Sequence, residues 1–220
     1  MTKNWLLGIT VASGLILAAP VQATLIDGFG DDQDTVTANE GDAQDSNTLK
    51  SVTDTALSQP VSRTLTVEFA EGNNNVEMGV ADDLLSFSSD SLTKGTGTVE
   101  WSFEAMDFSS PLRLELFVRE NDKDDTPFRF SLIGAEQFDF ESTLDHVSGD
   151  QPGVTQTFNM FSGDELTGIT GAEFFIDGSE TSALDLSVGS IKAVPAPGAL
   201  GLLGIGLLGL GLATRLGKRS

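Results

Sequence analysis

The side chains of this chain that could do chemistry are almost all carboxylates. The sequence has 33 Asp and Glu residues, one histidine and no cysteine. Thiolate nucleophiles and thiolate metal sites are therefore excluded, and a Ser-His-Asp triad would have to use His146. A catalytic zinc site would need His146 and carboxylates alone, which is an uncommon ligand set. His146 stands in a loop-like stretch, so we interpret it as a surface residue.

Carboxylates could instead serve a glycoside hydrolase or a calcium site. A hydrolase needs two acids at a spatial separation that the sequence does not reveal, and no pair stands out. Calcium prefers oxygen ligands, which are concentrated in two loop-like segments. These candidate ligands are Asp31, Asp32 and Asp34 in the first segment, and Asp122, Asp124 and Asp125 in the second. Neither segment has the Gly and Glu spacing of an EF-hand, and a solvated acidic cluster is the alternative interpretation of both.

Charge narrows the choice of partners. Residues 24–193 contain every acidic residue and only eight basic ones, for a formal net charge of −25. Such a field repels nucleic acid and anionic lipid surfaces, and it favours solubility. Nucleic acid is therefore excluded as an expected partner.

The apolar pattern from residue 61 onward has the period of two that is typical of strands with one buried face. The segments that show it are 65–69, 99–103, 112–118, 128–132, 138–140, 154–160, 174–176 and 184–188. Turn clusters rich in Gly, Asn and Asp separate them, and no long amphipathic helix interrupts the series. The pattern predicts an all-β fold, an antiparallel β-sandwich with jelly-roll topology.

The first part of this domain has a different composition. Residues 28–59 are rich in Asp, Thr, Ser, Asn and Gln and have few large apolar side chains. We therefore predict a loop or a peripheral, weakly ordered segment there. Residues 25–29 before it could form an edge strand that closes the sandwich.

Aromatic residues bear on carbohydrate binding, because sugar sites commonly present flat rings. The chain has no tyrosine, and Trp101 alternates in register with Val99 and Phe103, which predicts core packing. Phe117 and Phe175 fall on the opposite face from their neighbours, where they could line either a second buried face or a binding patch. If the domain binds polysaccharide, Phe117 or Phe175 should be among the exposed aromatic residues.

The two ends of the chain read as targeting segments. Residues 1–23 combine Lys3, an apolar run over 5–19 and a small-x-small site, so we predict a secretory signal peptide cleaved after Ala23. Residues 194–220 combine a Pro-x-Pro motif, an uncharged apolar helix over 198–214 and a basic tail. The motif is Val194, Pro195, Ala196 and Pro197, and the basic residues are Arg215, Lys218 and Arg219. A single-span membrane anchor is the alternative for either end.

The C-terminal segment resembles the PEP-CTERM sorting signal of Gram-negative bacteria that make exopolysaccharide. Ala196 stands where that family usually has glutamate. The resemblance covers about the last 27 residues. It implies secretion, transient membrane insertion through the C-terminal helix, processing by an exosortase, and delivery to the cell surface or the extracellular matrix.

A second resemblance concerns the ends of the domain. Residues 25–29 and 184–188 are similar to the first and last strands of galactose-binding-like jelly rolls, which often hold a structural calcium between them. This resemblance implies that Asp27 and Asp185 are calcium ligands.

Together these features predict three parts: a signal peptide (1–23), a secreted acidic β-sandwich (24–193) and a sorting signal (194–220). The predicted function is a structural or adhesive protein of the surface or biofilm matrix, with an exosortase, the secretion machinery and extracellular polysaccharide as partners. A carbohydrate-binding module with a defined glycan site is the alternative, and a secreted hydrolase is a third. No cofactor other than structural calcium is expected.

Overall fold

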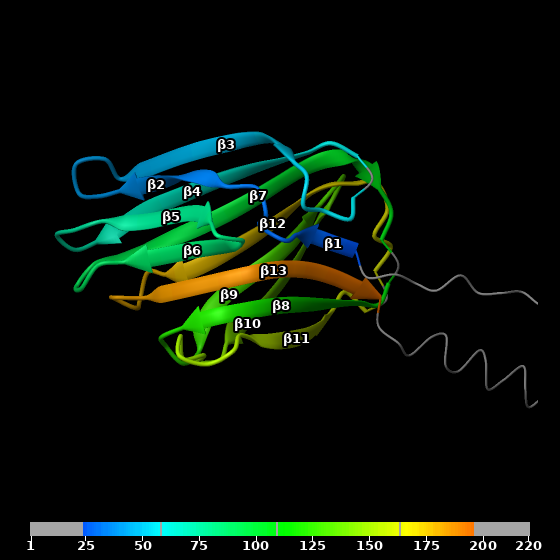
Figure 1. The fold of residues 1–220 in the computed structure, drawn as a ribbon. Helices are drawn as coiled ribbons and strands as arrows, with labels where there is room; N and C mark the ends of the chain where they lie inside the picture. The colour runs from blue at the N-terminus through cyan, green and yellow to red at the C-terminus, as the bar shows by residue number, and fades with distance from the viewer. Residues whose placement is uncertain (1–23, 58, 109, 163, 196–220) are drawn as a thin grey trace, which may run out of the picture.

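A computed structural model describes residues 24–57, 59–108, 110–162 and 164–195, which form two antiparallel sheets facing each other (Figure 1). The seven-stranded sheet has the order β11 (Val154–Met160), β8 (Leu112–Asn121), β13 (Asp185–Pro195), β6 (Leu84–Ser89), β5 (Val76–Ala81) and β2 (Gln33–Ala38), with β1 (Thr24–Asp27) paired to β13. The six-stranded sheet has the order β10 (Gln137–Leu144), β9 (Thr126–Ile133), β12 (Ile169–Gly178), β7 (Lys94–Met106), β4 (Val61–Glu71) and β3 (Gln44–Val52).

The strand order of the two sheets confirms the predicted jelly-roll sandwich. The chain crosses repeatedly from one sheet to the other, and β12 and β13 lie inside their respective sheets. β12 lies between β9 and β7, and β13 lies between β8 and β6. Consecutive strands such as β7 and β8, or β12 and β13, therefore lie in opposite sheets, whereas β5 and β6, and β9 and β10, pair within one sheet.

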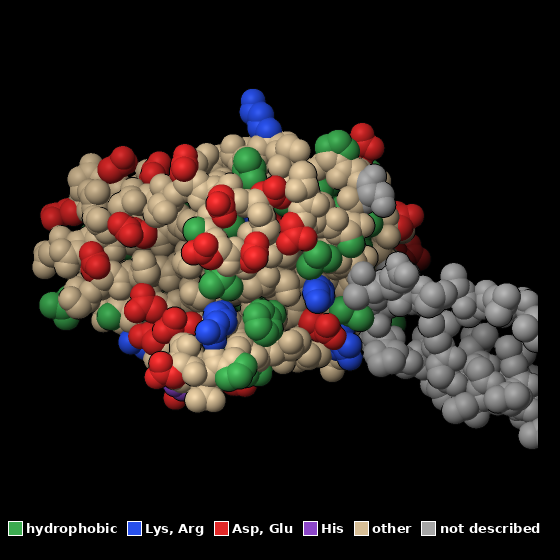
Figure 2. Space-filling view, viewed as in Figure 1, with side chains coloured by type: hydrophobic (Ala, Val, Ile, Leu, Met, Phe, Trp, Pro, Cys, Tyr) green, Lys and Arg blue, Asp and Glu red, His purple; other side chains and the backbone are tan. Residues whose placement is uncertain are grey.

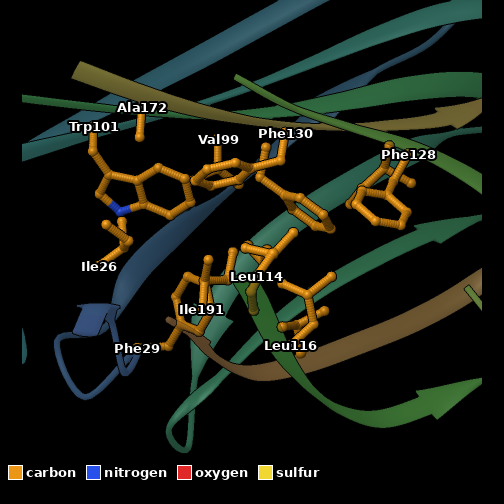
Figure 3. Packing of buried hydrophobic residues seen from close by; sticks show 14 of the residues in the cluster. Ile26, Phe29, Val99, Trp101, Leu114, Leu116, Phe128, Phe130, Ala172 and Ile191 are labelled. Carbon is orange, nitrogen blue, oxygen red and sulfur yellow. The ribbon is translucent and has the colours of Figure 1, made fainter. Parts of the chain in front are cut away.

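The core lies between the sheets and follows the alternation in the sequence. Val99, Trp101 and Phe130 project inward from the six-stranded sheet toward Leu114 and Ile191 of the other (Figure 3). Trp101 is 1% exposed, which confirms its prediction as a core residue. Each such side chain contributes about 1.5–3 kcal/mol when it is fully buried. Because every second residue is held inward, the residues between them must face solvent on the outer faces.

The prediction of a loop or weakly ordered segment over 28–59 is wrong, because β2 and β3 lie within it. β3 is an edge strand in which Leu49 and Val52 are the only apolar residues, so it lacks the alternation that marks the other strands. Its ladder to β4 is supported by polar pairs instead. Gln44 donates to Glu68 at 2.8 Å, and the Thr48 and Thr64 hydroxyls are 2.9 Å apart.

The first and last strands lie side by side. Thr24 of β1 pairs with Ala193 of β13, so residues 24 and 193 lie at the same end of the sandwich (Figure 1). β13 continues past the predicted boundary at 193, since Val194 pairs with Arg113 and Pro195 with Leu112 of β8. Two residues of the predicted sorting motif thus belong to the last strand of the domain.

The predicted signal peptide (1–23), the rest of the sorting motif (Ala196, Pro197), the apolar helix (198–214) and the basic residues Arg215, Lys218 and Arg219 lie outside the described residues. Within the part of the chain that the structure describes, there is no helix long and apolar enough to cross a membrane.

Candidate functional site

A groove of about 430 Å³ lies on the outer face of the six-stranded sheet, over β9, β10 and β12. Period-two alternation places it there, because the residues between the buried ones of each strand turn outward. Its lining combines two phenylalanines and a proline with charged and hydroxyl-bearing residues: Pro127, Phe128, Arg129, Glu141, Ser142, Thr143, Phe175 and Asp177.

Phe175 and Arg129 occupy the middle of this groove. They are direct cross-strand neighbours, and the Arg129 guanidinium carbon lies 4.9 Å from the centre of the Phe175 ring. Arg129 also donates to Glu173 Oε1 at 2.8 Å. This hydrogen bond and the charges of Glu173, Asp139 and Glu141 raise the pKa of Arg129 above its ordinary value. The guanidinium is therefore held charged over the Phe175 ring, at a distance typical of a cation–π contact.

Register places the groove in a row that crosses the whole sheet. From β10 to β3 the row contains Glu141, Arg129, Phe175, Thr98, Thr66 and Ser46. Its members are a carboxylate, a guanidinium, an aromatic ring and three hydroxyls. Such a surface offers an apolar platform for the flat face of a ring, with hydrogen-bonding groups for its polar rim.

The groove is bordered by carboxylates. Asp139, in the next row, accepts hydrogen bonds from Ser131 at 2.7 Å and Gln137 at 2.8 Å. The hydrogen bond from Ser131 in particular lowers the pKa of Asp139, which keeps it ionised. With Glu141, Glu173 and Asp177 nearby and Arg129 the one cationic side chain of the lining, the groove disfavours an anionic ligand.

Asp27 and Asp185 are not brought together. β1 meets β13 at Ile191, six residues beyond Asp185 along an extended strand. The Asp27 carboxylate is buried between the sheets, where it accepts from Arg63 at 2.8 Å, Trp101 Nε1 at 2.7 Å and the Phe29 amide at 2.7 Å. Burial raises the pKa of Asp27, and these three donors oppose that rise. Asp27 therefore anchors β1 to the core of the sandwich.

The first acidic segment is used in part by the fold. The Asp31 carboxylate accepts from the Thr53 amide and hydroxyl and from the Asp54 amide, which lowers the pKa of Asp31. Asp32 and Asp34 are exposed and line a second groove, of about 460 Å³, over β2, β5 and β6.

The second acidic segment lies between β8 and β9. Asp122 pairs with Lys123 at 2.8 Å and accepts from the Asp185 amide at 2.8 Å, while Asp124 and Asp125 are exposed. Within the described ranges, no three or more His, Asp and Glu side chains come together in a way that could hold a metal ion. His146 is exposed between β10 and β11, which confirms it as a surface residue.

Both aromatic candidates from the sequence are half-buried on outer faces, Phe175 on the six-stranded sheet and Phe117 on the seven-stranded one. The sequence did not indicate Arg129 as part of a site. Its only signal was its place between the inward residues Phe128 and Phe130, which turns it to the same side as Phe175. Recognising the pair required the β9–β12 register.

Comparisons with known proteins find no matching family model and no matching curated protein. Solved structures do align. A family 11 carbohydrate-binding module from Clostridium thermocellum, solved with a β-1,3-1,4-mixed-linked tetrasaccharide, is 12% identical, with 81% of this chain and 98% of that one covered and a TM-score of 0.40. TmCBM61, solved with β-1,4-galactotriose, is 6% identical, with 74% and 90% covered and a TM-score of 0.36.

PfGH50B is 9% identical, with a TM-score of 0.39, and the match covers 60% of this chain but 22% of that much longer one. Identities and TM-scores this low transfer neither a ligand nor an activity. What the groove of this chain binds must follow from its own residues.

Proposed function

We propose that this protein is an exported, non-catalytic glycan-binding protein, and that the groove over β9, β10 and β12 binds a neutral polysaccharide. The observation that carries the proposal is the Phe175–Arg129 pair at the middle of a polar groove. This combination supports binding rather than hydrolysis, because it supplies a platform and hydrogen-bonding groups around it.

The chemistry of the lining matches a sugar ring. The apolar face of a pyranose can lie on Phe175, while its hydroxyls reach the carboxylates of Glu141 and Asp177. Thr143 adds a hydroxyl that can donate or accept. Because carboxylates outnumber the single cation of the lining, uncharged glycans are favoured over acidic ones.

Binding to a panel of neutral polysaccharides tests this function. We expect the purified full chain to be retarded in affinity electrophoresis by at least one neutral polymer, and Phe175→Ala to abolish the retardation. Phe117→Ala is the matched control, since it removes a half-buried ring from the opposite face. If Phe175→Ala were retarded by the polymer as strongly as the wild type, the assignment of the groove would be overturned.

The proposed route to the surface is secretion followed by exosortase processing near Pro195. Its support is the sequence of the two ends, together with their adjacency in the sandwich, where Thr24 pairs with Ala193. A protein of the biofilm matrix that binds neutral exopolysaccharide would unite this route with the groove.

The intact mass of the exported protein tests the route. We expect a mature form that begins at Thr24 and has lost the apolar segment 198–214, and we expect that loss to depend on the exosortase. A full-length C-terminus in the exported protein would contradict the processing step. This result would leave the glycan-binding test of the groove unaffected, so the two proposals can fail separately.

A further inference from the structure

A second aromatic platform lies on the opposite side of the molecule. Phe117 projects outward from β8 between Thr155 of β11 and Ser190 of β13. Its ring lies over two glycines. A Cβ at Gly153 would stand 2.5 Å from its Cζ atom, and one at Gly189 would stand 2.8 Å from its Cδ1 atom. The ring thus spans from β8 toward both neighbours, in space that side chains at these two positions would occupy.

Cationic side chains flank this ring. Arg119 is two residues along the same strand, at a bulge where the β8–β13 register passes from Val118 to Glu120. Lys192 of β13 is paired with Glu115 and is therefore a diagonal neighbour of Phe117, at a typical distance of about 7–8 Å. Arg113, four residues before Phe117 on β8, is also basic, but it is ion-paired with Glu115 at 2.5 Å.

Two of these cations lack a carboxylate partner. Arg119 donates to the backbone oxygen of Gln151, and neither Arg119 nor Lys192 forms an ion pair with any residue that the structure describes. Of the eight basic residues of the domain, Lys50 is the other one without an ion pair among the described residues. Figure 2 shows basic side chains beside hydrophobic groups over β8 and β13, with acidic side chains among them, whereas acidic side chains predominate over β2 and β5.

We propose that this surface is a second glycan site, specific for an anionic polysaccharide that carries carboxylates. A sugar ring would stack on Phe117, and carboxylates on that ring or the next would be bound by Arg119 and Lys192. The ammonium and guanidinium groups supply charge-assisted hydrogen bonds, which are the stronger kind. The site uses none of the residues of the Phe175 groove and does not depend on the function proposed for that groove.

The composition of the surface favours a polysaccharide over a second copy of this chain. A stable protein interface buries about 800 Å² on each partner, and its centre is apolar. Around Phe117 the outward side chains of the neighbouring strands are small and polar or charged: Thr155, Thr157, Asn159, Ser187, Ser190 and Lys192, with Glu115 of β8 in register with Lys192. In the described residues the exposed large hydrophobic side chains are Leu92 and Val154, and Val154 borders this patch between Gly153 and Thr155.

Affinity electrophoresis of the full chain in gels that contain polygalacturonate tests the site, with a neutral polysaccharide gel as reference. We expect retardation by polygalacturonate, and a loss of affinity of about tenfold or more in Phe117→Ala, as for a central aromatic contact. Arg119→Gln/Lys192→Gln should lose the retardation and its salt dependence. Lys50→Gln/Lys94→Gln is the matched control, because it changes the net charge equally at residues of β3 and β7.

Each outcome decides for or against the proposal. Circular dichroism and the thermal midpoint establish that every variant is folded, and Gly41→Ala, at an exposed turn, is a further reference. No retardation by polygalacturonate overturns the site, as does equal loss in the matched charge control. A shift of the wild type to a dimer in analytical ultracentrifugation that Phe117→Ala abolishes would assign the patch to self-association instead.

Discussion

Each outer face of this sandwich carries an outward phenylalanine, but the charged side chains around the two rings differ. On the six-stranded sheet, Phe175 lies beside Arg129 and is bordered by carboxylates. On the seven-stranded sheet, Phe117 lies over two glycines and is flanked by Arg119 and Lys192. Because the fold supplies a similar platform on each side, the neighbouring charges decide which ligand each platform can accept. A jelly roll can in this way present two different binding faces on one core.

The largest expected effect comes from breaking the link on which both faces depend. Buried Arg63 of β4 in one sheet pairs with buried Asp27 of β1 in the other, at 2.8 Å. Arg63→Met should destabilise the protein by about 3–5 kcal/mol, because it leaves a buried charge unpaired. We expect urea denaturation followed by tryptophan fluorescence to show this loss, and both binding activities to disappear at the same urea concentration.

Arg113→Met is the control, since Arg113 is half-buried and its ion pair lies at the surface, where it contributes about 1 kcal/mol or less. Loss of one binding activity well before the other would mean that the two sheets do not unfold as one unit. The comparison of the faces would then have to treat each sheet separately.

The next largest effect should separate the two faces. A methyl group at Gly189 would collide with Cδ1 of Phe117 at 2.8 Å and displace the ring. We expect Gly189→Ala to cost about 1–3 kcal/mol, as in other overpacked sites. Polygalacturonate retardation should be lost while retardation by neutral polymer, through Phe175, stays. Unchanged polygalacturonate binding in this variant would show that the placement of the Phe117 ring is unimportant.

A charge reversal should make one face resemble the other. Glu141 pairs in register with Arg129 beside the groove. Glu141→Lys should confer weak polygalacturonate binding on a Phe117→Ala background, with an affinity gain of roughly fivefold for a partly screened surface charge. Glu104→Lys, at an exposed residue of β7 in the same sheet, is the control. If neither variant gains affinity for the acidic polymer, neighbouring charge is not what distinguishes the faces.

The sequence predicted the sandwich because its strands alternate strongly, and it singled out Phe117 and Phe175, both half-buried in the structure, because each falls on the opposite face from its neighbours. It failed at β3, whose polar residues form a ladder with no apolar face to mark it. It also paired Asp27 with Asp185, whereas Asp27 is held by Arg63 and Trp101 in the core. The Phe175–Arg129 pair and the cations around Phe117 depend on cross-strand register, which alternation alone does not determine.

The smallest expected effects concern acid stability, where one carboxylate on each sheet should act in the opposite sense. On β10, hydrogen bonds from Ser131 and Gln137 lower the pKa of Asp139 below its ordinary value of 3.8. The folded state then binds fewer protons there than the unfolded state, so this stabilisation is present above pH 3.8 and is lost as the pH falls through the lowered pKa. Asp139→Asn should therefore flatten the loss of stability below that pH.

On β13, burial and the charges of Asp122 and Asp90 raise the pKa of Asp185 above 3.8. The folded state then binds more protons there, so stability falls as the pH rises from 3.8 through the raised pKa. Asp185→Asn should raise the thermal midpoint slightly at neutral pH and leave it unchanged in acid, the reverse of Asp139→Asn. Midpoints of both variants between pH 3 and pH 7 measure this contrast, and parallel curves would contradict it. Because both carboxylates are largely exposed, we expect only small shifts in the thermal midpoint. The prediction is that the two shifts have opposite signs.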